Sequence, residues 1–179
     1  MIFLLMIFLT NITQIQPLNT IYNFKESKSV QDWYIVDDRV MGGLSKGNIK
    51  ISDSGTAIYY GDVTTANNGG FSSLRHQFKS KNVSNYKAVV IRLKGDEKTY
   101  QFRIKSNINQ RYSYVSSFKT NREWETIIIP FENFVPQFRG YRVNVPKYDG
   151  KQMQEIAFLL GNKLNESFQL EIESINLVK

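Results

Sequence analysis

The sequence predicts an all-β fold, an antiparallel β-sandwich or jelly roll of about nine or ten strands. Apolar and polar residues alternate with period two over several segments, as in strands with one buried face. Turn signals rich in Gly, Asn, Asp and Ser separate these segments at intervals of about 8–15 residues. Aromatic residues make up 13% of the chain, with ten Tyr and twelve Phe, which favours strands because flat side chains pack well on a pleated surface.

From Tyr34 onward the alternation marks strands in order along the chain. The clearest segment is TYQFRIKS, which places Tyr100, Phe102 and Ile104 on one face and polar residues on the other. FQLEIES and YKAVVIRLKG repeat this pattern, whereas WETIIIPF is apolar enough for both of its faces to be covered. We expect the remaining strands near residues 47–52, 56–63, 70–79, 111–118, 153–161 and 174–178.

The irregular parts are few. The only helical candidate lies around residues 131–134, and the longest irregular stretch runs from residue 133 to residue 152. Long loops in compact domains are often functional. The sequence shows no internal repeat and no low-complexity linker, so residues 18–179 are expected to form a single sandwich domain.

Composition limits the classes of partner. The formal net charge is +7, but the basic residues are scattered among apolar ones rather than gathered in a stripe, so we expect a solvated sheet face and no nucleic-acid binding. The chain has no cysteine, which excludes disulfides and thiol chemistry. We expect a monomer without a stable membrane span.

The N-terminus differs in character from the rest. MIFLLMIFL is nine apolar residues long, far short of the ~20 residues that a membrane span needs. It has the length of a signal-peptide apolar region, although no basic residue precedes it, and a buried first strand is the alternative. We interpret residues 1–17 as a signal peptide and expect an exported protein, periplasmic or secreted.

Candidate catalytic residues are sparse. His76 is the only histidine and lies in a predicted strand, where a structural role is expected, and one histidine does not make a metal cluster. Glu171 and Glu173 share a strand face, as on the ordinary wet face of a sheet. We therefore expect no catalytic residues, no cofactor and no metal site. A calcium ion held by aspartate and backbone oxygens stays open, although the chain contains no defined calcium loop.

Two polar segments each contain a Gly-Gly pair: VDDRVMGGLSKG, residues 36–47, and ANNGGFSSLR, residues 66–75. Gly-Gly before a strand allows positive φ and a close approach of another chain segment. Arg75 offers a planar donor fork for a carboxylate, and Asp38 is the obvious partner. We expect Asp38, Asn68, Arg75 and Arg139 to converge at one end or face of the sandwich, with Arg75 structural.

These two segments resemble the complex I intermediate-associated protein family. Its members carry an Asp-x-x-Met-Gly-Gly-x-Ser segment and an Asn-Gly-Gly-Phe-x-x-x-Arg segment, and the likeness extends over residues 22–179. The binding or structural motif residues are Asp38, Met41, Gly42, Gly43, Ser45, Asn67, Asn68, Gly69, Gly70, Phe71 and Arg75, to which Arg139 and Gly140 are added for their own Arg-Gly step.

The resemblance implies a galactose-binding-like β-sandwich and a non-catalytic role in assembling respiratory NADH:ubiquinone oxidoreductase. The export signal would make this chain a bacterial, exported, single-domain relative. A protein-binding assembly module is one interpretation, and a carbohydrate- or small-ligand-binding module is the other. A glycan-binding module would expose aromatic side chains, and the candidates are Phe138, Tyr141 and Tyr148.

Overall fold

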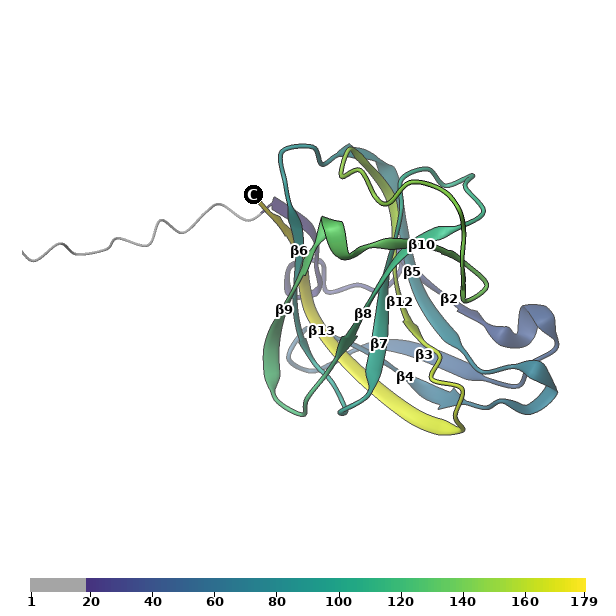
Figure 1. Ribbon diagram of the computed structural model, residues 1–179. Helices are drawn as coiled ribbons and strands as arrows, with labels where there is room; N and C mark the ends of the chain where they lie inside the picture. Colours follow the sequence, from purple (N-terminus) through teal and green to yellow (C-terminus); the bar gives the residue numbers. More distant parts are fainter. Residues whose placement is uncertain (1–18) are drawn as a thin grey trace, which may run out of the picture.

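The computed structural model describes residues 19–179, which form two antiparallel sheets packed face to face (Figure 1). The predicted jelly-roll sandwich is confirmed, whereas the signal-peptide prediction falls on residues outside the described part. The strands are β1 (Asn19–Asn23), β2 (Trp33–Asp37), β3 (Lys46–Ile51), β4 (Ala57–Val63), β5 (Ser72–Asn82), β6 (Ala88–Lys94), β7 (Thr99–Lys105), β8 (Ser113–Lys119), β9 (Trp124–Pro130), β10 (Val135–Phe138), β11 (Tyr141–Arg142), β12 (Gln152–Leu160) and β13 (Glu166–Val178).

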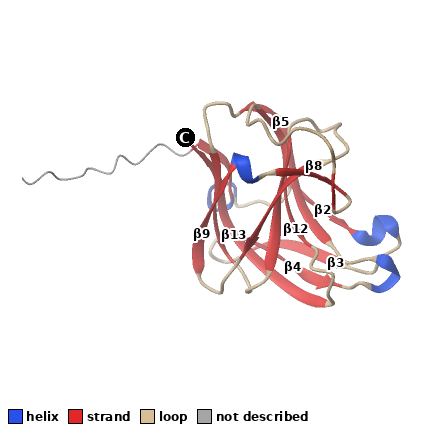
Figure 2. Ribbon diagram, viewed as in Figure 1, coloured by secondary structure: helices blue, strands red, loops and turns tan. Residues whose placement is uncertain are grey.

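The first sheet has six strands in the order β3-β4-β13-β6-β9, with β1 paired to β13. The second has seven strands in the order β11-β10-β8-β7-β12-β5-β2. Helical turns are short: α1 (Phe24–Ser27) and the 3-10 turns η1 (Asp38–Met41), η2 (Ala66–Asn68) and η3 (Phe131–Asn133). The turns η1 and η2 lie together at the end of the sandwich opposite the C-terminus (Figure 2). This end carries both Gly-Gly segments.

The core lies between the sheets and is rich in aromatic rings. Phe102 of β7 and Phe158 of β12 are fully buried and meet edge to face, with ring centroids 5.1 Å apart. His76 also points inward, where it stacks on Trp33 at 4.9 Å and its Nδ1 bonds the carbonyl oxygen of Asp32. Burial lowers the pKa of His76, so the ring is neutral near pH 7. His76 is thus packed into the core between the sheets.

Three sequence expectations differ from the structure. The segments 168–174 and 174–178 form one strand, β13, because a register shift between Ile172 and Ser174 breaks the alternation without ending the strand. The stretch 133–152 is not wholly irregular, since it contains β10 and β11. The strand at WETIIIPF has only one covered face, because Ile128 is 61% exposed. No helix within residues 19–179 is long and apolar enough to cross a membrane.

Candidate functional site

A buried carboxylate lies at the centre of the two Gly-Gly segments. Asp38, the first residue of η1, is fully buried and accepts hydrogen bonds from the Ser45 amide at 3.0 Å and hydroxyl at 2.5 Å. The amides of Gly70 and Phe71 also donate to it, at 2.6 and 3.3 Å. Burial alone would raise the pKa of Asp38, but these donors hold it below its usual value. The neighbouring Asp37 points the other way. It accepts hydrogen bonds from the Gly47 amide of β3 and the Ser72 hydroxyl of β5.

Further hydrogen bonds join three loops into one rigid end. The Ser45 hydroxyl accepts from the Thr64 amide at 3.0 Å, which ties the first Gly-Gly segment to the residues that lead into the second. The Asn165 side chain accepts from the Thr65 amide at 2.8 Å, which adds the loop between β12 and β13. The two Gly-Gly segments thus meet around Asp38. The expected convergence of Asp38 with Arg75 and Arg139 is wrong, because Arg75 pairs with Glu155 and Arg139 lies in the β10–β11 turn, at the opposite edge of the seven-stranded sheet from β2 and β5. We call this end of the molecule the tip, and it comprises residues 38–45, 64–71 and 161–165.

The glycines at the tip serve two different purposes. Gly42 and Gly70 adopt φ of +89° and +130°, a backbone conformation that side chains with a Cβ disfavour. Gly43 does not have positive φ, contrary to expectation, and a Cβ there would lie 2.3 Å from the Asp38 carboxyl carbon. At Gly69 a Cβ would lie 2.4 Å from a carboxylate oxygen of the same aspartate. One glycine of each pair therefore lets the backbone close over Asp38.

Gly43→Ala is expected to destabilise the fold by about 2 kcal/mol, because the added methyl group overpacks the Asp38 site. Gly140→Ala is the matched control, since Gly140 has φ of +83° but nothing lies within 4 Å of its added Cβ. That control should cost only about 1 kcal/mol of backbone strain. Urea unfolding of both variants measures the difference. Equal losses would show that close approach at Gly43 is unimportant.

Arg75 does not pair with Asp38, which corrects the sequence prediction. It lies on β5 and points to the outer face of the seven-stranded sheet, where Nη1 is 3.8 Å from Glu155 of β12. The Glu155 carboxylate also accepts from the Tyr34 hydroxyl at 3.2 Å and from Gln77 Nε2 at 2.8 Å. Its side chain is only 4% exposed, against 25% for Arg75. The predicted Arg75 site is thus a separate polar cluster on the sheet face.

A second arginine belongs to this cluster. Arg103 lies across β12 from Arg75, since both are registered opposite Ala157. Burial, and after it the charge of Arg75, lower the pKa of Arg103 to about 10, with Glu155 opposing the shift. Burial, and after it the charge of Glu155, raise the pKa of Tyr34 to about 12. Glu155 therefore pairs with Arg75, whereas the Arg103 guanidinium hydrogen-bonds Gln101 and feels the carboxylate only as a nearby charge. The sequence hinted at this carboxylate only by a single Glu in the apolar run of β12.

The predicted aromatic residues and the Arg-Gly step lie mostly on one hairpin. Arg139 and Gly140 form the two-residue turn between β10 and β11, with φ of +51° and +83°, as a type I′ turn needs. Tyr141 is 79% exposed. The Arg139 guanidinium lies over the Phe138 ring, 5.4 Å from the ring centroid. Tyr148 is only 6% exposed and belongs to the core, so it does not offer a ring face to a ligand.

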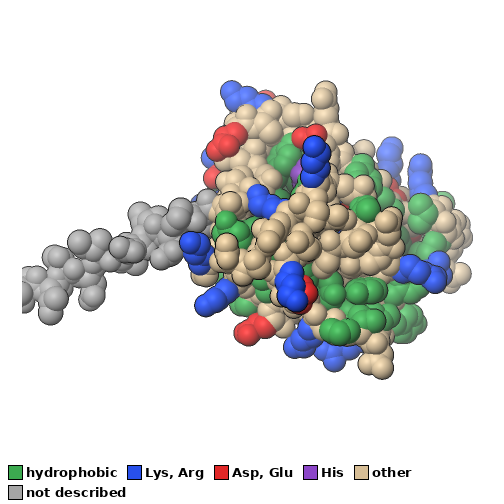
Figure 3. Space-filling model, turned by 90° about the horizontal axis from the view of Figure 1, so that it is seen from above, with side chains coloured by type: hydrophobic (Ala, Val, Ile, Leu, Met, Phe, Trp, Pro, Cys, Tyr) green, Lys and Arg blue, Asp and Glu red, His purple; other side chains and the backbone are tan. Residues whose placement is uncertain are grey.

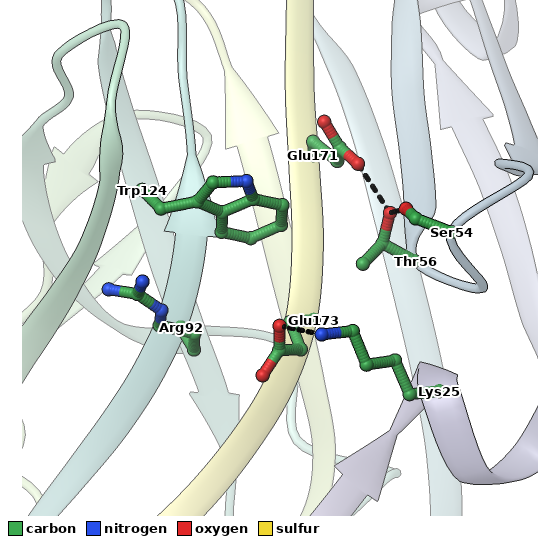
Figure 4. A pocket seen from close by; sticks show the side chains of 7 residues that line it. All are labelled: Lys25, Ser54, Thr56, Arg92, Trp124, Glu171 and Glu173. Atoms are coloured by element: carbon green, nitrogen blue, oxygen red, sulfur yellow. Dashed lines mark hydrogen bonds and ion pairs between the residues drawn. The ribbon is translucent and has the colours of Figure 1, made fainter.

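A shallow hollow of about 290 Å³ lies on the outer face of the six-stranded sheet (Figure 4). Its carboxylates are already engaged: Glu171 accepts from the Thr56 hydroxyl, and Glu173 pairs with Lys25 Nζ at 2.6 Å. Glu171 and Glu173 are therefore surface residues of β13 that each have a partner within the chain. The lining residues are Lys25, Ser54, Thr56, Arg92, Trp124, Glu171 and Glu173. Residues 19–179 contain no group of three or more His, Cys, Asp or Glu side chains placed to hold a metal ion.

Sequence comparison places the chain among known proteins. The model of the family described as Complex I intermediate-associated protein 30 (CIA30) matches residues 22–172. The mitochondrial complex I intermediate-associated protein 30 of Mus musculus is 24% identical over 186 residues, covering 90% of this chain and 56% of that protein. A probable mitochondrial counterpart in Caenorhabditis briggsae is 25% identical, covering 87% and 53%. The chain thus spans about half the length of these curated relatives. Their names overturn the prediction of an exported protein, which is wrong.

Structural comparison supports the fold. The family 11 carbohydrate-binding module of a cellulosomal cellulase of Clostridium thermocellum superposes with a TM-score of 0.66 at 19% identity, covering 91% of this chain and 95% of the module. A carbohydrate-binding module specific for non-crystalline cellulose superposes with a TM-score of 0.56 at 7% identity, covering 92% and 96%. At such identities the likeness concerns the jelly-roll sandwich alone.

Proposed function

The chain belongs to the complex I intermediate-associated protein 30 family, and from this membership we propose that it is a non-catalytic module that binds a protein partner during assembly of NADH:ubiquinone oxidoreductase. The observation that carries the proposal is the family match over residues 22–172, which covers nearly all of the sandwich. The curated relatives are named for association with an intermediate of complex I.

The β10–β11 hairpin is the surface that we propose for this partner. Tyr141 is 79% exposed, and Arg139 and Arg142 are exposed beside it. Residues 134–147 contain three cations and no carboxylate, and a hollow of about 410 Å³ adjoins the hairpin. Tyrosine and arginine are enriched at the energetic centres of protein interfaces. The chemistry therefore fits a partner with an acidic rim and a pocket for an aromatic ring.

The double variant Tyr141→Ala/Arg142→Glu is expected to lose about 1,000-fold in affinity for the partner, because two such anchors contribute about 2 kcal/mol each. In cells that lack the chromosomal copy, it should fail to restore assembled complex I on native gels, whereas wild type and Lys79→Glu should restore it. The thermal melt should be unchanged, since both side chains are exposed. Full restoration by the double variant would contradict the hairpin as the binding surface. Normal complex I assembly in cells without the chain would contradict the proposed assembly role itself.

A carbohydrate-binding role is the second candidate, because the same exposed Tyr141 ring could stack on a sugar face. The two roles differ in their dependence on charge. A neutral glycan would be lost with Tyr141→Ala and retained with Arg142→Glu, whereas an acidic protein surface would respond to both. Binding of each variant to mixed-linked glucan on affinity gels separates them.

A further inference from the structure

The tip exposes an apolar cluster that the proposed function does not use. Val40, Met41 and Leu44 are 72%, 51% and 59% exposed, and Leu164 on the adjoining loop is 59% exposed. These are large side chains on loops, where polar residues would be ordinary. The loops that hold them are fixed by the buried Asp38 and by the bonds from Ser45 and Asn165 described above. The cluster is therefore presented to solvent by a rigid support.

The exposed charges on the tip itself are of one sign, and the adjoining carboxylates of Asp62 and Glu166 already accept hydrogen bonds from Ser167 and Asn162. Residues 38–45, 64–71 and 161–165 contain a single carboxylate, that of Asp38, which is fully buried. Arg39 and Lys163 are exposed, and neither makes an ion pair with any residue from 19 to 179. In Figure 3, hydrophobic and basic side chains gather at the end of the molecule farthest from the grey segment, with little acidic surface visible there. The tip thus joins apolar side chains to unneutralised cations.

We propose that the tip docks on an anionic lipid surface. Val40, Met41 and Leu44 would enter the boundary between headgroups and acyl chains, which interfacial segments reach to a depth of about 5–10 Å. Arg39 and Lys163 would pair with lipid phosphates, and the net charge of +7 would draw the whole molecule to such a surface. The combination favours lipid over a protein pocket, because the cations flank a protruding loop that has no opposite charge of its own. This docking goes beyond the proposed function and uses a surface other than the hairpin.

The absence of cysteine allows a local test on the full chain. A single Leu44→Cys change carries an environment-sensitive NBD dye at the tip, and Asp53→Cys carries it in the exposed turn between β3 and β4 as the control. Vesicles of phosphatidylcholine with 30% phosphatidylglycerol are the probe, against pure phosphatidylcholine. We expect a blue shift and quenching by a lipid-attached quencher at position 44 with the anionic vesicles only, and no change at position 53.

Charge reversal at the tip adds a second readout. Arg39→Glu/Lys163→Glu should weaken binding of the tip to the anionic vesicles by at least about 25-fold, since each lost cation alone costs roughly fivefold and the new carboxylates are repelled by the surface. Lys79→Glu/Lys119→Glu makes the same change of charge from exposed strand positions and should weaken it less. Because the dye reports position 44 itself, attachment of the chain through any other segment does not mimic the result. A dye at position 44 that stays in water on anionic vesicles overturns the proposal and leaves a protein pocket as the occupant of the cluster.

Discussion

Asp38→Ala is expected to lower the free energy of unfolding by about 3–5 kcal/mol, because three amides and one hydroxyl lose a buried, charged acceptor. The loss is not confined to one bond. The carboxylate joins the loop after β2 to the loop before β5, so its removal leaves buried donors on both sides without a partner. For a domain of this size the melting temperature should fall by on the order of 10 °C.

Urea unfolding of the full chain measures this loss, with Asp53→Ala as the control, since Asp53 is exposed in the turn between β3 and β4. The pH dependence gives a separate check. The pKa of Asp38 is lowered in the folded state, so its contribution is complete above the unfolded value of about 3.9 and disappears as pH falls through the folded value. The gap between wild type and Asp38→Ala should therefore narrow below about pH 4. A gap that stays constant down to pH 2 would contradict a stabilising charge at this position.

The strands were predictable where one face is wet and the other is buried. In β7, Tyr100, Phe102 and Ile104 are fully buried and the residues between them are not, so the alternation survives in the sequence. β13 was divided in two because the bulge between Ile172 and Ser174 shifts the side-chain parity, and sequence alternation has no way to mark a strand that continues past such a shift. The hairpin was missed because β10 and β11 are four and two residues long, below the length at which a period is visible.

The partner of Asp38 was not predictable from residue types. An aspartate and an arginine in neighbouring motifs suggest an ion pair, but the Gly70 and Phe71 amides hold the carboxylate. Arg75 comes four residues after Phe71, and a strand rises about 3.3 Å per residue, so its Cα lies roughly 13 Å farther along the sheet. Backbone amides carry no signature in the sequence, whereas a charged side chain does. The sequence therefore located the converging loops and misassigned the donors.

Glu155→Ala is expected to cost about 3–5 kcal/mol, as when one partner of a buried charge cluster is removed. The side chain is 4% exposed, and its loss leaves Arg75 without its ion-pair partner and Arg103 without the nearby negative charge. Glu132→Ala is the matched control, because Glu132 is exposed. Urea unfolding at pH 7 is the measurement. A loss near that of the control would show that the cluster is solvated in solution.

Arg75→Ala should cost less, about 1–2 kcal/mol, although it removes a member of the same cluster. Glu155 would keep the Tyr34 hydroxyl, Gln77 and the nearby charge of Arg103, and the Arg75 side chain is 25% exposed and 3.8 Å from the carboxylate. In the double variant no buried carboxylate is left uncompensated, so the combined loss should be smaller than the sum of the two single losses. This order of effects distinguishes a residue that supports the sheet from one that contacts a ligand. If Arg75→Ala melts like wild type while Glu155→Ala is strongly destabilised, Arg75 is free to act in binding, and the structural role assigned to it from the sequence is wrong.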